Sequence, residues 1–444
     1  MKKKLLLLPL LTLSIGTTSL AQETPGNNTL NSEMTHRTCG TEVPGAEWDA
    51  WFNEQVELYK QSPNKVQQDF VIPVIIHLVH GGQAVGTFPN ISYAQLNSQI
   101  AVLNADYGGT GFNVANVPAA FSSLVSNTNV KFCMALKDPQ GATLAEPGVE
   151  RINYSTKGWA NPTAATTSTA FTTYMNGTVK PATIWDPTRY MNIWVCDRNS
   201  ATQLLGYATF PAGSTLSGMS GTGTATTDGF WSWAKSFGNT GTLDPTYNKG
   251  RTATHEIGHW LGLRHVWGDA NCATDYCNDT PPAQTSNFGC PTFPYNSGTC
   301  SGNTTGEMTM NFMDYTDDPC MYMFTPDQRT RIQTAMTNGT YRKLLGTHGL
   351  CTVVGIESTN FTESEISIFP VPSQGTVSVK TELASACDLQ FTLVNSLGQQ
   401  VFQRNEKNMQ NNTLQLNLST YEKGFYFLKI NAGNKTTVKK IMLD

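Results

Sequence analysis

The chain has few charged residues and no excess of basic ones. Of its 444 residues, 14% are Asp, Glu, Lys or Arg, and the formal net charge is −4 at pH 7. Proteins that bind nucleic acid usually carry clustered Lys and Arg, so the composition argues against nucleic acid as a partner. The sparse charge, together with abundant Asn, Thr, Ser and Gly, is more typical of an extracellular surface.

The chain also lacks a long apolar run beyond its first 21 residues. No later stretch approaches the roughly 18 to 20 apolar residues that a spanning helix needs, so we expect no transmembrane segment. At the start, lysines precede an apolar run over 5–13 and the small-residue site Ser19-Leu20-Ala21. This order is typical of a cleaved secretory signal. We therefore expect a secreted protein, either extracellular or attached to the cell surface.

Hydrophobic patterning divides the chain, which has no internal repeat. The near-continuous apolar run over 69–82 predicts a strand covered on both faces, and the spacing over 92–108 predicts a helix packed on it. Further strands are expected over 130–138 and 191–197, which indicates an α/β layer. From about residue 364, strict alternation predicts a small all-β sandwich. The expected parts are a signal peptide (1–21), a leader with one small helix (22–62), a main domain (63–352), a linker (353–363) and the sandwich (364–444).

The most informative stretch is "THEIGHWLGLRH", residues 254–265. On a helix, His255 and His259 lie four apart on one face and can present their rings to one point. Gly262 permits the left-handed turn that ends a helix, so that His265 can supply a third ligand. Three protein ligands and an open fourth position are characteristic of catalytic zinc. The plainer alternative is a surface helix with incidental histidines, but three of the seven histidines within eleven residues favour the metal site.

The residues "HEIGHWLGLRH" match the metzincin signature of zinc peptidases, and "MNFMDYTDDPCMYMFTPDQ" resembles the Met-turn of the pappalysin (ulilysin-like, M43) branch. The resemblance covers roughly residues 36–350. It implies a twisted mixed sheet with an active-site helix, and a zinc endopeptidase in which Glu256 is the general base. It also implies that Met313 lies under the zinc and that Tyr315 hydrogen-bonds the developing oxyanion.

The leader contains "HRTCGTE". In the pappalysin branch a cysteine in an R-x-C-G context occupies the open zinc position and keeps the zymogen inactive, so the resemblance makes Cys39 a zymogen switch. Thiolate is a strong zinc ligand. The alternative is a disulfide between Cys39 and another cysteine. We expect maturation between residues 60 and 70.

Ten cysteines in an exported chain are more typical of disulfides than of thiols. The resemblance implies the pairs Cys272–Cys300 and Cys290–Cys320. Pairing by elimination then gives Cys277–Cys351 and Cys133–Cys196, and leaves Cys387 as a buried thiol in the sandwich.

The segment "GDANCATDYCNDTPP" gathers hard oxygen ligands of the kind that Ca²⁺ prefers. A matching stretch binds calcium in relatives, which makes Asp275, Asp279 and Thr280 the expected structural calcium ligands. An irregular turn of solvated Asx residues is the alternative.

Substrate should bind as an extended strand added to a sheet edge. The candidate segments for this edge, called the substrate rim, are "LLGYATFP" (204–211) and "TDGFW" (227–231), and the alternative is that they are ordinary loop. Relatives that cleave beside basic residues carry an acid directly before the last cysteine of the Met-turn segment. That position is Pro319 here, which argues against a strict basic preference, although Asp317 and Asp318 stand near.

The final segment resembles the C-terminal sorting domain of the type IX secretion system, in the blocks "ISIFPVPSQGTVSV", "LVNSLGQQVF" and "GFYFLKINAGNKTTVKKIML". The secretion machinery is therefore an expected partner, besides protein or peptide substrates. A generic adhesive β-sandwich is the alternative. For the whole chain, we weigh the secreted zinc endopeptidase against two rivals: another zinc hydrolase in which a glutamate replaces His265 as ligand, and a non-catalytic surface adhesin that retains the fold.

Overall fold

The structure is a computed structural model. It describes residues 34–62, 69–213, 216, 219–351, 365–383, 386–395, 399–432 and 435–444. The expected signal peptide, the linker over 353–363 and most of the expected maturation region lie outside the described residues, so their boundaries stay predictions. Across the described ranges, no helix combines the length and the apolar character that a membrane crossing requires.

The main domain is built on a six-stranded mixed sheet in the order β2-β1-β4-β6-β5, with β3 also paired to β1. The strands are β1 (Phe70–His80), β2 (Val130–Met134), β3 (Val149–Asn153), β4 (Met191–Cys196), β5 (Gly206–Ala208) and β6 (Phe230–Trp233). All pairs are parallel except β5 with β6. The apolar run predicted to be covered on both faces forms β1, which is buried along almost all of its length.

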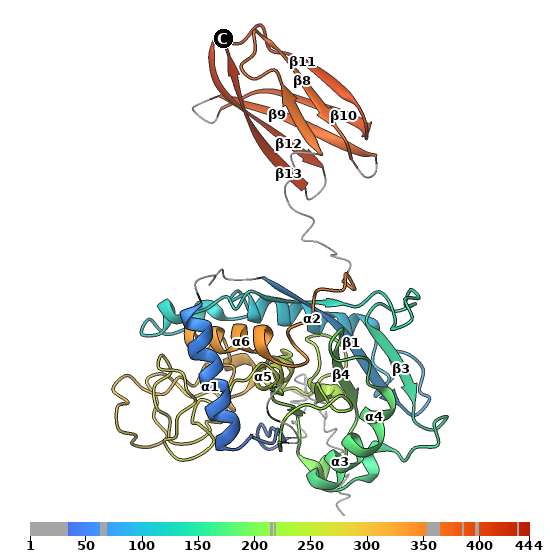
Figure 1. Cartoon of the computed structure of the whole chain (residues 1–444), viewed down its shortest axis with the longest axis vertical. Helices are drawn as coiled ribbons and strands as arrows, with labels where there is room; N and C mark the ends of the chain where they lie inside the picture. The colour runs from blue at the N-terminus through green and yellow to red at the C-terminus, as the bar shows by residue number, and fades with distance from the viewer. Residues whose placement is uncertain are drawn as a thin grey trace, which may run out of the picture.

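Within the described residues, six α-helices accompany the sheet: α1 (Ala46–Gln61), α2 (Tyr93–Tyr107), α3 (Ser168–Tyr174), α4 (Lys180–Thr183), α5 (Arg251–Trp260) and α6 (Pro326–Asn338). A π-helical turn, Met175–Val179, joins α3 to α4. Short 3₁₀ turns cover Val114–Asn116, Ser122–Leu124, Pro162–Ala164, Ser200–Thr202, Ala234–Ser236 and Asp318–Cys320. Helix α5 packs against α2, β5 and β6, and α1 lies beside α6 (Figure 1).

The leader helix α1 is part of the main hydrophobic core. Trp48, Phe52 and Val56 are spaced four apart, share one helical face and are buried against the same cluster as α5 and β1. The Trp48 indole also donates a hydrogen bond to the carbonyl of Pro211 at 2.8 Å. The leader is therefore packed on the domain along its helix.

The C-terminal unit is the all-β sandwich that the alternation predicts (Figure 1). One sheet has the order β10-β9-β12-β13 and the other β11-β8-β7, with every pair antiparallel. The strands are β7 (Ile366–Phe369), β8 (Thr376–Thr381), β9 (Cys387–Asn395), β10 (Gln400–Met409), β11 (Thr413–Asn417), β12 (Gly424–Ala432) and β13 (Lys435–Leu443). The unit has its own hydrophobic core. The predicted fold class, a mixed α/β domain followed by an immunoglobulin-like sandwich, is confirmed.

The disulfides agree with the expectation in part. Cys272–Cys300 and Cys290–Cys320 are the pairs that the resemblance implies. The pairings Cys277–Cys351 and Cys133–Cys196 are wrong, because Cys133 is bonded to Cys351.

Sheet order explains the error. Strand β1 separates β2 from β4. Along β1, Cys133 lies opposite Pro73, whereas Cys196 follows the partner of Leu78, so the two cysteines are about 20 Å apart, beyond the reach of a disulfide. Cys196 and Cys277 are buried thiols instead. Cys387 is half-buried on β9 rather than fully buried as expected.

Candidate active site

The active-site helix α5 carries two of the three predicted ligands, and a turn directly after it carries the third. His255 and His259 are fully buried on α5. Gly262 has a φ of +87°, the left-handed conformation that ends the helix, and the chain turns back so that His265 reaches the same point. The Nε2 atom of His259 lies 3.2 Å from that of His255 and 3.1 Å from that of His265.

Each of the three histidine rings is held through its Nδ1 atom. Nδ1 of His255 donates to the carbonyl of Phe312, and Nδ1 of His259 donates to the carbonyl of Leu263, both at 2.8 Å. Nδ1 of His265 contacts the carboxylate of Asp269. Because a carbonyl can only accept, Nδ1 carries the proton in the first two rings and Nε2 is a bare lone pair. Burial lowers the pKa of His255 well below its usual value and that of His259 to about 3, which keeps both rings neutral.

This donor set fits a zinc ion. The Nε2 lone pairs of His255 and His259 face each other at 3.2 Å and cannot hydrogen-bond to each other, and a cation held between them and His265 would satisfy both. In tetrahedral coordination with Zn–N distances of about 2.0 to 2.1 Å, two ligand nitrogens stand about 3.3 Å apart. The spacing in this site is close to that value.

Glu256 lies beside the histidines and outside the ligand set. Burial raises the pKa of its carboxyl to about 7, while hydrogen bonds from the leader lower it. The edge strand passes close to this carboxylate at Gly206, where an added Cβ would lie 2.7 Å from the Glu256 Cγ. Glycine at 206 therefore lets β5 approach the carboxylate, which leaves Glu256 facing the space between α5 and the sheet edge.

Met313, the residue predicted to lie in a Met-turn, packs against α5. Met313 is fully buried, its amide donates to the Asn311 side chain at 2.9 Å, and its sulfur occupies the space where a Cβ on Gly258 would be. Gly258 is thus required by the close approach of Met313 between the two ligand positions of α5.

Tyr315 stands at the side of the histidines. Its ring centroid lies 4.9 Å from that of His265 and 4.9 Å from that of Trp267, both edge-on. Burial raises the pKa of its phenol well above the usual value, so the hydroxyl keeps its proton and can donate a hydrogen bond.

The leader cysteine lies at the same centre. The Cys39 Sγ and one nitrogen of each of the three histidines all lie within 4.8 Å of one another. The thiol also donates to Oε2 of Glu256 at 3.3 Å, and the Thr41 hydroxyl donates to the same oxygen at 2.9 Å. Burial and the negative charge of Glu256 raise the pKa of the Cys39 thiol, so its ionisation requires a nearby cation.

The leader runs along the predicted substrate rim. Strand β5 forms an edge of the sheet, the Gly40 amide donates to the carbonyl of Gly206 at 2.8 Å, and the Leu205 amide donates to that of Thr38 at 3.1 Å. The bridge between Cys39 and Gly206 is parallel. The leader therefore takes up backbone groups that an added substrate strand would need.

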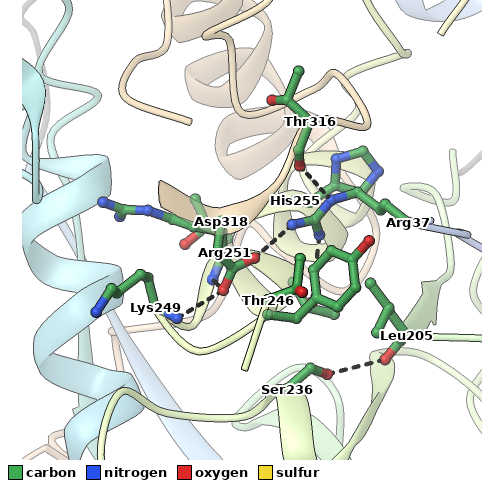
Figure 2. Close-up of polar contacts among 12 residues, drawn as sticks. Arg37, Leu205, Ser236, Thr246, Lys249, Arg251, His255, Thr316 and Asp318 are labelled. Carbon is green, nitrogen blue, oxygen red and sulfur yellow. Dashed lines mark hydrogen bonds and ion pairs between the residues drawn. The ribbon is translucent and has the colours of Figure 1, made fainter. Parts of the chain in front are cut away.

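Arg37, two residues before Cys39, is buried against Asp318 and Thr316 (Figure 2). The sequence reasoning missed this arrangement, which is called the Asp318 pocket below. The Arg37 guanidinium is 2.5 Å from Oδ1 of Asp318, and Nε donates to the carbonyl of Thr316 at 3.1 Å. The other Asp318 oxygen accepts from the backbone amides of Lys249 and Arg251 at the start of α5, as Figure 2 shows.

Other groups absent from the sequence-based prediction also fix the site. Asp228 lies two residues before β6. Both of its carboxylate oxygens accept from the guanidinium of Arg342 at 2.7 Å, and one also accepts from the indole of Trp260 at 3.1 Å. This buried network ties the end of α5 to the sheet. Its members are 32 to 114 residues apart, and no local pattern links them.

The expected calcium ligands all hydrogen-bond within the protein. Both Asp275 oxygens accept from the Thr280 hydroxyl at 2.8 and 2.9 Å, and burial raises the pKa of Asp275 to about 7. Asp279 instead binds the start of α6, where it accepts from the Thr325 hydroxyl and the Asp327 amide. The calcium set stays a prediction.

Comparisons with known proteins agree with this geometry. The family described as pregnancy-associated plasma protein-A, peptidase M43, matches residues 173–337. The family described as secretion system C-terminal sorting domain matches residues 367–444.

Two solved structures are similar over most of their length. Mature mirolysin of Tannerella forsythia in complex with a cleaved peptide is 38% identical, and the match covers 63% of this chain and 96% of that one with a TM-score of 0.53. A promirolysin mutant from the same organism is 35% identical, with 70% and 97% covered and a TM-score of 0.57.

Curated relatives are named extracellular metalloproteases. One from Arthroderma otae is 28% identical over 67% of this chain and 90% of its own length. One from Verticillium alfalfae is 44% identical over 21% of this chain and 33% of its own length, so the chain spans about a third of the first curated relatives that it matches.

Proposed function

Because the chain belongs to the M43 (pappalysin-type) family of metallopeptidases, we propose that it is a secreted zinc endopeptidase made as a zymogen. The observation that carries this proposal is the convergence of three histidine Nε2 atoms, with neighbouring distances of 3.1 and 3.2 Å, and with Glu256 beside them and outside the ligand set. A non-catalytic adhesin would need neither the carboxylate nor the leader thiol that lies on it.

The residues present can carry out the chemistry. His255, His259 and His265 would hold the zinc, which when bound supplies a Lewis acid and lowers the pKa of water toward about 7. Oε2 of Glu256, once free of Cys39 and Thr41, would take a proton from the attacking water and pass it to the leaving amine. The Tyr315 hydroxyl would donate a hydrogen bond to the oxyanion that develops on the substrate.

In this proposal, the leader keeps the zymogen inactive through three contacts with the active site. Cys39 would serve as the fourth ligand, since its sulfur lies among the histidines. The backbone around Cys39 covers β5, and Arg37 fills the Asp318 pocket. Removal of the leader would therefore free the metal position, the substrate edge and one side-chain pocket together.

The Asp318 pocket supports a preference for substrates with Lys or Arg beside the cleaved bond. Asp318 is fully buried, and the leader already places a guanidinium on it while occupying the substrate edge. In this proposal, Asp318 would take the role of the acid that relatives with a basic preference carry at the position of Pro319.

A peptide library digested by the mature chain and mapped by mass spectrometry tests this function. We expect cuts beside Lys or Arg that cease when a chelator is added, and loss of the basic preference in Asp318→Ala. Cleavage that continues without metal would contradict the proposal for zinc. Cuts without any basic preference would contradict only the assignment of the pocket.

We also propose a structural calcium ion held by Asp275, Asp279 and Thr280. The support is a buried carboxylate whose ionisation is opposed by burial, in a loop that two disulfides brace. Calcium that leaves thermal stability unchanged when added to the metal-depleted chain would contradict this part.

The sorting-domain match at 367–444 supports export by the type IX machinery, with that machinery as a partner. It agrees with the extracellular relatives and with a secreted or cell-surface location.

A further inference from the structure

The outer face of the tail carries an ordered set of exposed side chains on its last two strands. Strands β12 and β13 pair antiparallel, with Phe425 opposite Met442, Phe427 opposite Lys440, and Lys429 opposite Val438. Directly opposite residues of an antiparallel pair point to the same side of the sheet. Since the intervening Leu428, Ile430 and Ile441 point into the core, these six side chains, here called the β12–β13 patch, face outward.

The β12–β13 patch is unusually apolar for an outer face. The exposed fractions are 46% for Phe425, 37% for Phe427, 54% for Val438 and 36% for Met442. Folding of the tail gains nothing from leaving these side chains in water, and contiguous exposed apolar patches on soluble domains usually mark interaction sites. The neighbouring strand extends the apolar surface, because Phe427 also lies opposite the half-buried Val394 of β9.

The charge of the β12–β13 patch has one sign. Lys429 and Lys440 are its only ionisable members, and neither β12 nor β13 contains Asp or Glu. The Lys440 ammonium lies 3.8 Å from the centroid of the Phe425 ring, which holds the cation next to the aromatic surface. A partner that complements this surface needs carboxylates around apolar pockets for the two phenylalanines.

We propose that the β12–β13 patch is the surface by which the tail docks on an acidic, apolar-lined protein surface of the secretion machinery. The inference rests on the proposed export function of the tail and not on the peptidase activity. Aromatic anchors beside complementary charges are the usual centre of such interfaces.

The test uses the full chain expressed in its native host. We compare the double variants Phe425→Ser/Phe427→Ser and Lys429→Glu/Lys440→Glu with the wild type by immunoblot of periplasm, cell surface and medium. Both variants should show at least a tenfold loss of surface and extracellular chain, with accumulation in the periplasm. Lys429→Arg/Lys440→Arg keeps the charge and should be exported normally.

The matched control removes exposed apolar side chains elsewhere on the tail. Phe369 and Val371 are 47% and 43% exposed, and Phe369→Ser/Val371→Ser should be exported like the wild type. Thermal melting of the purified periplasmic chains shows whether the variants are folded. Since both lysines are exposed, their charge reversal keeps the test valid if the phenylalanine variant does not fold.

Normal export of the folded patch variants overturns the proposal, as does an equal loss in the control. Normal export with loss of self-association in sedimentation would assign the patch to a second copy of the chain instead. Normal export with loss of binding to anionic lipid vesicles would assign it to a membrane surface. Because export is read by immunoblot, a failure of the proposed peptidase function gives a different result.

Discussion

Replacement of Arg37 by alanine should loosen the leader from the active site. Arg37 and Asp318 are 2% and 0% exposed, and their closest atoms are 2.5 Å apart. Removing one partner of a buried ion pair costs about 3 to 5 kcal/mol, because the remaining charge is left without compensation. Here the Asp318 carboxylate keeps the amides of Lys249 and Arg251, so the lower end of this range applies.

A loss of about 3 kcal/mol raises the population of detached leader about a hundredfold, at about 1.4 kcal/mol for each factor of ten. The assay is the initial rate at which the purified precursor cleaves a peptide, together with its rate of conversion on gels. Arg37→Lys keeps the charge and should give a much smaller increase. A double-mutant cycle with Asp318→Asn, scored by conversion, isolates the pair from other effects of each change.

The reasoning is refuted if the folded Arg37→Ala precursor stays as silent as the wild type and converts no faster. A coupling energy below about 0.5 kcal/mol in the cycle, which is the size expected of independent sites, would also refute the reasoning. Latency would then reside in Cys39 and α1 alone.

Four further outcomes are expected. Cys39→Ala in the precursor should produce early activity or self-cleavage, whereas a silent precursor would indicate steric blockade by the leader. Burial lowers the pKa of Lys180 to about 7 from its usual 10.5. Between these two values the unfolded chain binds a proton that the folded chain has lost, so stability rises with pH. Lys180→Met should therefore melt at a higher temperature than the wild type at pH 6, by a margin that shrinks at pH 9.5. Asp275→Asn should abolish any stabilisation by calcium in a thermal melt. Deletion of residues 364–444 should preserve peptidase activity but leave the chain in the periplasm of its host, and normal export of the deletion would contradict the sorting role.

The parts that could be predicted from the sequence depend on short-range geometry. The helix predicted over 92–108 follows from the spacing of its apolar residues and is α2 (Tyr93–Tyr107). The site follows from His255 and His259 on one helical face with Gly262 at the turn. In each case a few neighbouring residues determine the local conformation, so the sequence pattern predicts it.

The parts that could not be predicted depend on contacts between distant segments. The pairing of Cys133 with Cys351 spans 218 residues and requires the strand order. The contact between Arg37 and Asp318 spans 281 residues. Lys180 was not singled out, because a buried ammonium over the rings of Trp194 and Tyr207 has no local sequence signal.

The most direct test of the central claim measures bound zinc and peptidase activity side by side for the mature wild type and Glu256→Ala. Since Glu256 is proposed to act on the water and not on the metal, both proteins should contain about one zinc per chain, and only the wild type should cleave peptides. A Glu256→Ala chain that still cleaves peptides, or one that is folded but has lost its zinc, would contradict the account.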